Sequence, residues 1–146
     1  MYIFLDIDGV LNQLQMNYYL DTNCIKQLGN LCHTLGAEVV LTSTWKTGYT
    51  HSYERCTPQV QKLIDLFRQN NIVIESRTRT VQGGNRADEI QEYVERNQIK
   101  DYIILDDDKS LFGNYTKGLY MVNPSHGLTA GDVKKIVKMW KKKQNG

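Results

Sequence analysis

The chain has 146 residues, of which 40% are hydrophobic and 23% charged, and its formal net charge is +2. This length and composition predict a single globular domain over residues 1–146, and they exclude collagen-like and low-complexity sequence. No apolar run approaches the roughly 18 residues of a membrane-spanning helix, and the first residues lack the basic region of a signal peptide. We therefore expect no membrane contact. Because the three cysteines are odd in number and fit no metal-binding spacing, we expect free thiols in a cytoplasmic protein.

Buried strands and amphipathic helices alternate along the whole chain. In chain order, the pattern predicts a strand at Tyr2–Leu5, a helix capped by Asp21, a strand at Val39–Leu41, a helix capped by Thr57, a strand at Ile72–Ile74, a helix capped by Asn85, strands at Tyr102–Leu105 and Leu119–Val122, and a last helix that begins at Thr129. Pro58 is typical of a first helical position, and Gly36 is typical of the residue just beyond a helix. The chain closes with a basic tail of about residues 138–146, whose lysines either contact nucleic acid or complement the dipole of a solvated helix end.

Strands of continuous Val, Ile and Leu separated by helices predict a parallel sheet covered on both faces. The expected fold class is therefore α/β, a doubly wound, Rossmann-like domain with a mainly parallel five-stranded sheet. The loops that enter the strands are short, whereas those that leave them are long, at residues 12–20, 43–57, 76–85 and 107–118. Because open α/β sheets bind ligands at the carboxyl edge of their strands, we expect the functional site there.

Two of the predicted strands end in acidic residues. Asp6 and Asp8 follow the first strand, and Asp106, Asp107 and Asp108 follow the fourth. A single Asp at such a place is typical of a turn, but this many carboxylates at one edge of a small sheet repel each other strongly. A bound divalent cation relieves that repulsion, and a set of oxygen ligands favours Mg²⁺.

Four segments resemble, in order, the motifs of the haloacid dehalogenase (HAD) superfamily, and they cover nearly the whole chain. They are Asp6-x-Asp8-Gly9-Val10-Leu11 for motif I, Val39-Val40-Leu41-Thr42-Ser43 for motif II, Arg86 at a helix start for motif III, and Ile103-Ile104-Leu105-Asp106-Asp107 for motif IV. Within the superfamily, four stretches are similar to the HAD domains of Swiss Army Knife RNA repair proteins, namely Leu5 to Asn12, Thr42 to Lys46, Ile104 to Asp108 and Gly127 to Thr129.

The resemblance implies an Mg²⁺-dependent phosphomonoesterase that works through an aspartyl-phosphate intermediate. Asp6 would be the nucleophile, Asp8 would protonate the leaving group and then activate water, and Gly9 would keep the phosphate pocket clear of a side chain. Thr42 would donate its hydroxyl to a phosphoryl oxygen, and Arg86 would hold the anion. The implied metal site comprises Asp6, Asp8, Asp106 and Asp107, with Asp107 contacting Mg²⁺ and Asp106 supporting it.

The sequence leaves three assignments open. Motif II is compatible with Thr42 or Ser43; Thr42 is favoured because it directly follows the apolar run, with Ser43 as a second phosphate contact. Lys46 is an alternative cation, although Arg86 has the expected place between the third and fourth strands. The run of three acids leaves open which of them ligates the metal, Asp106, Asp107 or Asp108.

The loops after the predicted strands leave no room for a folded cap domain, so we expect an open site for a large substrate. Lys46, Arg77 and Arg79 are interleaved there with aromatic residues that include Trp45 and Tyr18. Cations with exposed aromatic rings bind single-stranded nucleic acid through phosphate attraction and base stacking, so the predicted substrate is a phosphorylated RNA or DNA end or a nucleotide. The alternative for these loops is an ordinary solvated surface whose aromatic rings fold onto the core.

Two other functions are compatible with the sequence. A phosphoprotein phosphatase would use the same residues on a different large substrate. A non-catalytic phospho-acceptor or binding module would share the fold, but receiver domains carry their acceptor Asp after the third strand, where this chain has Ile74-Glu75-Ser76. The sequence makes no prediction of the oligomeric state.

Overall fold

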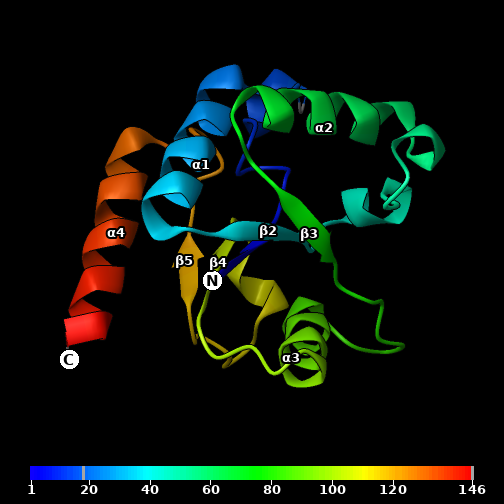
Figure 1. Ribbon diagram of the computed structural model, residues 1–146. Coiled ribbons are helices and arrows are strands. Elements are labelled where there is room, and N and C mark those ends of the chain that lie inside the picture. The colour runs from blue at the N-terminus through cyan, green and yellow to red at the C-terminus, as the bar shows by residue number, and fades with distance from the viewer. Residues whose placement is uncertain (18, 146) are drawn as a thin grey trace.

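The computed structural model describes residues 1–17 and 19–145, in which four α-helices surround a five-stranded sheet (Figure 1). The strands are β1 (Tyr2–Leu5), β2 (Glu38–Leu41), β3 (Ile74–Arg77), β4 (Tyr102–Asp106) and β5 (Leu119–Met121). The α-helices are α1 (Thr22–Leu35), α2 (Pro58–Gln69), α3 (Arg86–Arg96) and α4 (Ala130–Asn145). Short 3₁₀ helices follow several strands, namely η1 (Leu14–Met16), η2 (Thr44–Gly48), η3 (Tyr53–Arg55) and η4 (Lys109–Leu111). Tyr18, one of the aromatic residues named above, lies outside the described residues.

The described strands are all parallel, in the order β3-β2-β1-β4-β5. β1 lies at the centre, and Leu5 at its end is in register with Leu41 of β2 and Leu105 of β4. The chain runs outward from β1 through β2 to β3 and then crosses to β4 on the other side of β1. The carboxyl ends of β1 and β4 therefore form the switch point of the sheet, where α/β proteins bind ligands. The predicted doubly wound α/β fold is confirmed.

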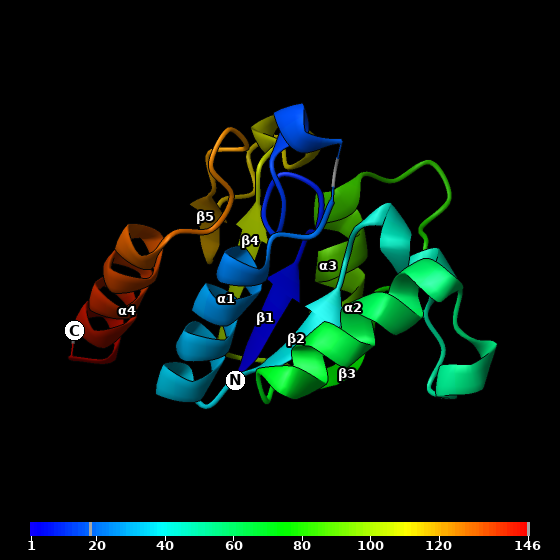
Figure 2. The same ribbon diagram turned by 90° about the horizontal axis from the view of Figure 1, so that it is seen from above.

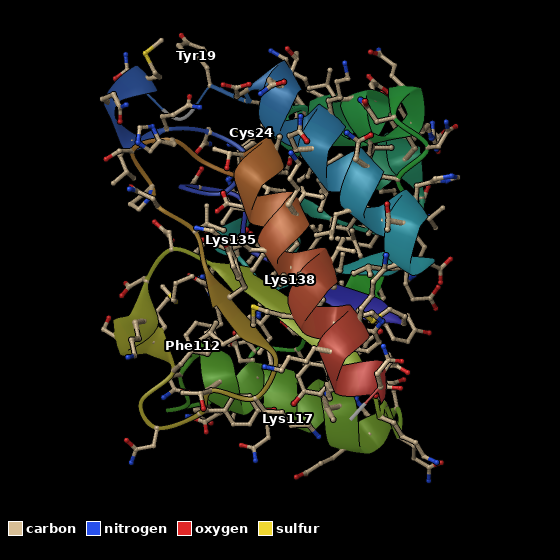
Figure 3. All side chains as sticks on the ribbon, turned by 90° about the vertical axis from the view of Figure 1, so that its left-hand side faces the viewer. Tyr19, Cys24, Phe112, Lys117, Lys135 and Lys138 are labelled. Atoms are coloured by element: carbon tan, nitrogen blue, oxygen red, sulfur yellow. The ribbon has the colours of Figure 1, made fainter. Side chains whose placement is uncertain are left out.

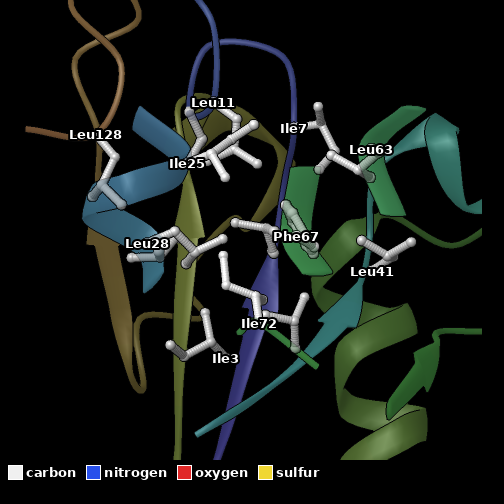
Figure 4. Close-up of a cluster of buried hydrophobic side chains, with 14 of the residues drawn as sticks. Ile3, Ile7, Leu11, Ile25, Leu28, Leu41, Leu63, Phe67, Ile72 and Leu128 are labelled. Atoms are coloured by element: carbon white, nitrogen blue, oxygen red, sulfur yellow. The ribbon is translucent and has the colours of Figure 1, made fainter. Parts of the chain in front are cut away.

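Helices cover both faces of the sheet. α1, α2 and α4 lie on one face and α3 on the other (Figures 1 and 2). Alternate side chains of β1 serve the two layers: Ile3 and Leu5 pack in the larger core cluster, shown in Figure 4, whereas Phe4 packs edge-to-face on Tyr93 of α3. Burying an aliphatic or aromatic side chain contributes about 1.5–3 kcal/mol, so this two-sided packing holds β1 rigidly beneath the loop that follows it.

The third strand begins later than predicted. The apolar run Ile72–Ile74 suggested a strand, but β3 spans Ile74–Arg77. Ile72 is buried in the core directly after α2, whereas Val73 is 53% exposed, so the two residues do not continue the alternation of a strand. β3 lies at the edge of the sheet and pairs with β2 through an irregular register. The later start carries Arg77 to the carboxyl edge of the sheet.

No folded cap occurs in the described ranges. The chain between β1 and α1 holds only η1, and the chain between β2 and α3 holds only η2, η3, α2 and β3. The expectation of a domain without a folded cap is therefore confirmed. The carboxyl edge of the sheet is bordered by loops and single helical turns.

The helix ends follow the predicted capping signals. The four predicted N-cap side chains all accept a backbone N–H of their own helix, at Asp21, Thr57, Asn85 and Thr129. The basic tail is helical as far as it is described, and Lys135 and Lys138 are exposed along the outer side of α4 (Figure 3). Lys142 and Lys143 lie in its last turn, where they complement the helix dipole. None of the helices in the described ranges has the length and apolarity that a bilayer crossing demands.

Candidate active site

The acids that follow β1 and β4 meet because the two strands are adjacent and end at the same level. The Asp6 backbone N–H donates to the Leu105 carbonyl oxygen at 3.0 Å, which extends the strand pairing by one residue. Asp6 is only 4% exposed, and Asp106 is fully buried. One carboxylate oxygen from each of Asp6, Asp106 and Asp107 lies within 4.8 Å of the other two. These three residues form the acidic cluster.

Charging the acidic cluster is costly. Burial, and then the neighbouring Asp106, raise the pKa of Asp6 to about 9, against the opposing effect of Arg86. Burial likewise raises the pKa of Asp106, again opposed by Arg86. One guanidinium therefore does not offset the desolvation and mutual repulsion of these carboxylates. Because the donors are all carboxylate oxygens, the cluster fits a hard divalent cation such as Mg²⁺.

Arg86 supplies the cation that the protein itself brings to the cluster. It occupies the first position of α3, whose start is fixed by reciprocal hydrogen bonds between Asn85 and Asp88. Its Nη1 lies 3.1 Å from Oδ1 of Asp6 and 2.8 Å from Oδ2 of Asp106. The cap of α3 thus sets the position from which one guanidinium bridges both buried carboxylates.

Lys46, the alternative cation, lies elsewhere. Its Nζ is 2.9 Å from Oε1 of Glu89 and 3.1 Å from Oγ1 of Thr78, and its side chain is buried. Glu89 lies one turn after Arg86 on α3, so the same helix face serves both cations. Of the two candidates, the structure places Arg86, and not Lys46, beside Asp6.

The consecutive acids after β4 have different partners. Asp106 accepts from Arg86 through Oδ2 and from the backbone N–H of Asp108 through Oδ1. Asp108 caps η4 by accepting from the backbone N–H of Ser110 at 3.0 Å. Both oxygens of Asp106 are thus engaged by the protein, and Asp108 is engaged in a turn. Asp107 is the member of the run whose carboxylate is best placed for a metal.

Asp107 lies against the turn that follows β1. A Cβ at Gly9 would overlap the Asp107 carboxylate, and the φ of Gly9 is +84°, a conformation that other residues rarely adopt. The Asp107 carboxyl group also helps to raise the pKa of Asp6, because a hydrogen bond between the two requires a proton and because two charged carboxylates repel. Glycine at position 9 therefore clears the space in which Asp6 and Asp107 approach each other.

Asp8 is held apart from the acidic cluster. Its Oδ1 accepts from Nδ2 of Asn12 at 2.9 Å, and its Oδ2 accepts from Nε1 of Trp45 at 3.3 Å. Asn12 is fully buried, and its Oδ1 accepts from the Gly9 backbone N–H at 2.7 Å. Asn12 therefore links the Asp8 side chain to the backbone of the turn that follows β1. Among the described residues, the group of close carboxylates does not include Asp8, which the implied metal site did. The side chain of Asp8 is instead held by Asn12 and Trp45.

Trp45 differs from the exposed stacking platform predicted for it. The ring is 7% exposed and packs in the larger core cluster. The Oγ of Ser43 caps η2 by accepting the Trp45 backbone N–H at 3.2 Å, and this turn carries the indole inward. A buried ring offers no face to a base, so the alternative of an aromatic folded onto the core holds here. Trp45 contributes its N–H to Asp8, and the Ser43 hydroxyl serves as a cap.

Thr42 has an unused hydroxyl. Its backbone N–H donates to the Leu5 carbonyl oxygen at 3.1 Å, which places the residue beside the end of β1. The side chain is 1% exposed, and its Oγ1 has no hydrogen-bond partner among the described residues. A buried polar atom without a partner costs about 1–3 kcal/mol. An oxygen of a bound ligand would satisfy this hydroxyl.

Two residues of this arrangement were not predicted as functional, Asn12 and Glu89. The signal for Asn12 was its position four residues after Asp8, within reach of the same turn. The signal for Glu89 was its position one helical turn after Arg86. The remaining predicted contacts, Arg77 and Arg79, are exposed at the end of β3.

A HAD-like domain is the class of protein that this fold and site define, because its uncapped parallel sheet brings motifs I, II, III and IV together at the switch point. Residues 2–133 match the family described as the HAD domain in Swiss Army Knife RNA repair proteins. The chain belongs to this family, and the resemblance seen in the sequence is confirmed. No curated protein and no solved structure gives a significant match to the chain.

Proposed function

We propose that the protein is an Mg²⁺-dependent phosphomonoesterase that acts on nucleic-acid ends or nucleotides through an aspartyl-phosphate. The observation that carries this proposal is that three groups lie at the carboxyl ends of β1 and its two neighbouring strands. They are the buried carboxylate of Asp6, the guanidinium of Arg86 that bridges it to Asp106, and the unpartnered hydroxyl of Thr42. The family supports hydrolase chemistry of the phosphatase type in an RNA-repair setting.

The protein's own residues supply each step of the reaction. A carboxylate oxygen of Asp6 attacks phosphorus, the bond to the leaving oxygen breaks, and Asp8 gives that oxygen its proton. Asp8 then takes a proton from water, the water oxygen attacks phosphorus, and inorganic phosphate leaves Asp6 regenerated. Thr42 and Arg86 donate hydrogen bonds to the transferring group, on which negative charge is spread.

The proposed reaction also uses Mg²⁺, which the acidic cluster would bind. Asp6 and Asp107 would hold Mg²⁺, while Asp106 stays bound to Arg86 behind them. Bound there, the ion offsets the negative charge of the carboxylates and polarises a phosphoryl oxygen.

A phosphatase screen in the presence of Mg²⁺ tests the proposal directly. The substrates are oligonucleotides with a 3′ or 5′ phosphate, mononucleotides, and phosphopeptides. We expect release of inorganic phosphate from the nucleic-acid substrates, with loss of release in EDTA. Turnover of phosphopeptides alone would instead favour the phosphoprotein phosphatase, which an uncapped site also admits.

A non-catalytic phospho-acceptor is disfavoured by the end of β3. That strand ends at Arg77, and the residues that follow it are Thr78 and Arg79. In chain order, no acid therefore directly follows the third strand, which carries the acceptor in a receiver domain.

Thr42→Val is expected to separate stability from activity. Valine keeps the shape of threonine and removes the unpartnered hydroxyl, so the melting temperature should stay the same or rise. Loss of a hydrogen-bond donor to the transferring phosphoryl group should lower kcat by about 10²-fold. Thermal unfolding and steady-state kinetics on one preparation measure both effects. A melting temperature well below that of the wild type, or an unchanged kcat, would contradict the role assigned to Thr42.

Trp45→Phe is expected to weaken the acid-base step. Phenylalanine keeps a ring in the core but removes the N–H that Asp8 accepts, and a hydrogen bond to a charged group is worth about 1.5–3 kcal/mol, or 10- to 100-fold in rate. An alkyl phosphate, whose leaving oxygen needs a proton, should lose more of its first-step rate than p-nitrophenyl phosphate, whose leaving group needs none. Rapid-quench measurement of the first turnover gives these rates.

Trp140→Phe is the matched control for Trp45→Phe, because Trp140 packs on the core from α4, remote from Asp8. It makes the same chemical change and should leave the ratio of the two rates unchanged. An equal loss on both substrates in Trp45→Phe would mean that Trp45 serves only the packing of η2.

A further inference from the structure

A pocket lies between η2, the carboxyl end of β3 and the last residue of α3. Four cationic residues line it, Lys46, Arg77, Arg79 and Arg96, together with His51. The rest of its lining consists of three threonines and one serine, and its volume is about 490 Å³. Of the residues that the structure describes, no aspartate or glutamate lines this basic pocket. Cations and hydroxyl groups without an acid are the lining that phosphate groups require.

Two of the four cations are already neutralised within the protein. Lys46 is paired with Glu89 at 2.9 Å, and Arg96 is paired with Glu92 at 2.6 Å. Arg77 and Arg79 are exposed and have no ion pair within the described part of the chain. The net positive charge of the basic pocket therefore comes from these two arginines.

Arg77 is held in place by the backbone of η2. Its Nη1 donates to the Lys46 carbonyl oxygen at 2.6 Å, which uses one of the five N–H groups of the guanidinium. The Lys46 side chain is in turn fixed by Thr78, the residue after Arg77, at 3.1 Å. The loop after β2 and the end of β3 are thus locked together, so the guanidinium keeps its charge at a set distance from the active site.

That distance follows from the register of the sheet. Arg77 of β3 pairs with Leu41 of β2, and Leu41 pairs with Leu5, the residue before Asp6. Two strand spacings of about 4.8 Å separate the backbones of Arg77 and Leu5 by roughly 10 Å. This backbone separation exceeds the width of one phosphate group. A ligand that uses both sites must carry at least two anionic groups on a chain that spans the gap.

We propose that the basic pocket binds an internal phosphate of a polynucleotide strand whose terminal phosphate lies at Asp6. This inference rests on the proposed phosphatase function and names the substrate class as a polynucleotide rather than a mononucleotide. A polynucleotide repeats its charge at every residue of its backbone, as two adjacent phosphate sites require. The backbone of a phosphopeptide is neutral, so a peptide with a single phosphate offers the second site no regularly placed backbone charge.

The test replaces Arg77 and Arg79 together by Gln, which removes the charge and keeps a polar side chain with N–H donors. Lys134→Gln/Lys135→Gln is the control, because it removes the same charge from exposed residues of α4 that precede the basic tail. In hydrolysis, kcat/KM for a phosphorylated ten-nucleotide strand should fall at least roughly tenfold in the arginine variant, the effect of losing one hydrogen bond between charged groups. Hydrolysis of p-nitrophenyl phosphate and of a mononucleotide should not change, and the control should match the wild type.

Binding is measured separately in an Asp6→Asn background, as a function of salt, with the same strand. Each phosphate that is no longer neutralised should flatten the log–log slope by about 0.7. If the arginine variant binds the oligonucleotide as well as the wild type does, the proposed role of the basic pocket is wrong, even if the wild type is an active phosphatase. Equal loss on the small ester and the strand also overturns it, because the arginines would then serve the active site. Binding that depends on Arg77 and Arg79 without any wild-type hydrolysis supports the pocket and overturns the proposed function instead.

Discussion

Replacing Asp6 with Asn is expected to abolish turnover while the protein stays folded. The amide has the shape of the carboxylate but is a very poor nucleophile, and removal of a nucleophile costs at least about 10³-fold in kcat. Because burial and Asp106 disfavour the charged form of Asp6, the neutral amide should raise the melting temperature at pH 8 in EDTA. Kinetics and thermal unfolding of the same variant therefore move in opposite directions.

Asp108→Asn is the matched control for this experiment. It makes the same change two residues from Asp106, at a side chain that caps η4, and asparagine is an equally good cap. Its activity and melting temperature should both stay close to those of the wild type. Asp6→Asn activity within about tenfold of the wild type would rule out the covalent mechanism.

The positions of the chemical groups along the chain could be predicted from the sequence, because the ends of parallel strands must meet at one edge. The order of the elements placed Asp6, Asp106 and Arg86 at the same edge before any contact was known. The partners of each side chain at that edge could not be predicted in this way. Asp8 and Asp6 are separated by one residue, yet one joins the acidic cluster and the other is held by Asn12 and Trp45.

The sequence pattern alone could not determine which cation, Lys46 or Arg86, lies beside Asp6. Lys46 and Arg86 both lie at the carboxyl edge of the sheet, and either side chain is long enough to reach Asp6. Glu89 in the first turn of α3 decides between them, because it pairs with Lys46, and this pairing depends on how that helix packs. The burial of Trp45 is of the same kind, because a loop aromatic folds inward only if the three-dimensional core has room for it.

The stability of the protein without a metal is expected to fall as pH rises. In the unfolded chain Asp6 and Asp106 titrate near the ordinary value of about 4, whereas in the folded protein both pKa values are raised, that of Asp6 to about 9. Between these limits the folded state binds more protons than the unfolded state, so the free energy of unfolding decreases with pH. The slope for each group is at most about 1.4 kcal/mol per pH unit.

Mg²⁺ is expected to reverse this loss, and more strongly at pH 8 than at pH 5, because protons compete with the ion for the same carboxylates. At a hundred times its dissociation constant, a ligand of the folded state contributes about 2.7 kcal/mol, or roughly 5–10 °C in melting temperature for a chain of this size. Circular dichroism melts in EDTA and in millimolar Mg²⁺, at both pH values, measure the effect. Asp107→Asn should remove the response to Mg²⁺, whereas Asp101→Asn, an exposed acid at the opposite edge of the sheet, should retain it. Identical melting curves with and without Mg²⁺ at pH 8 would show that the acidic cluster does not bind the ion.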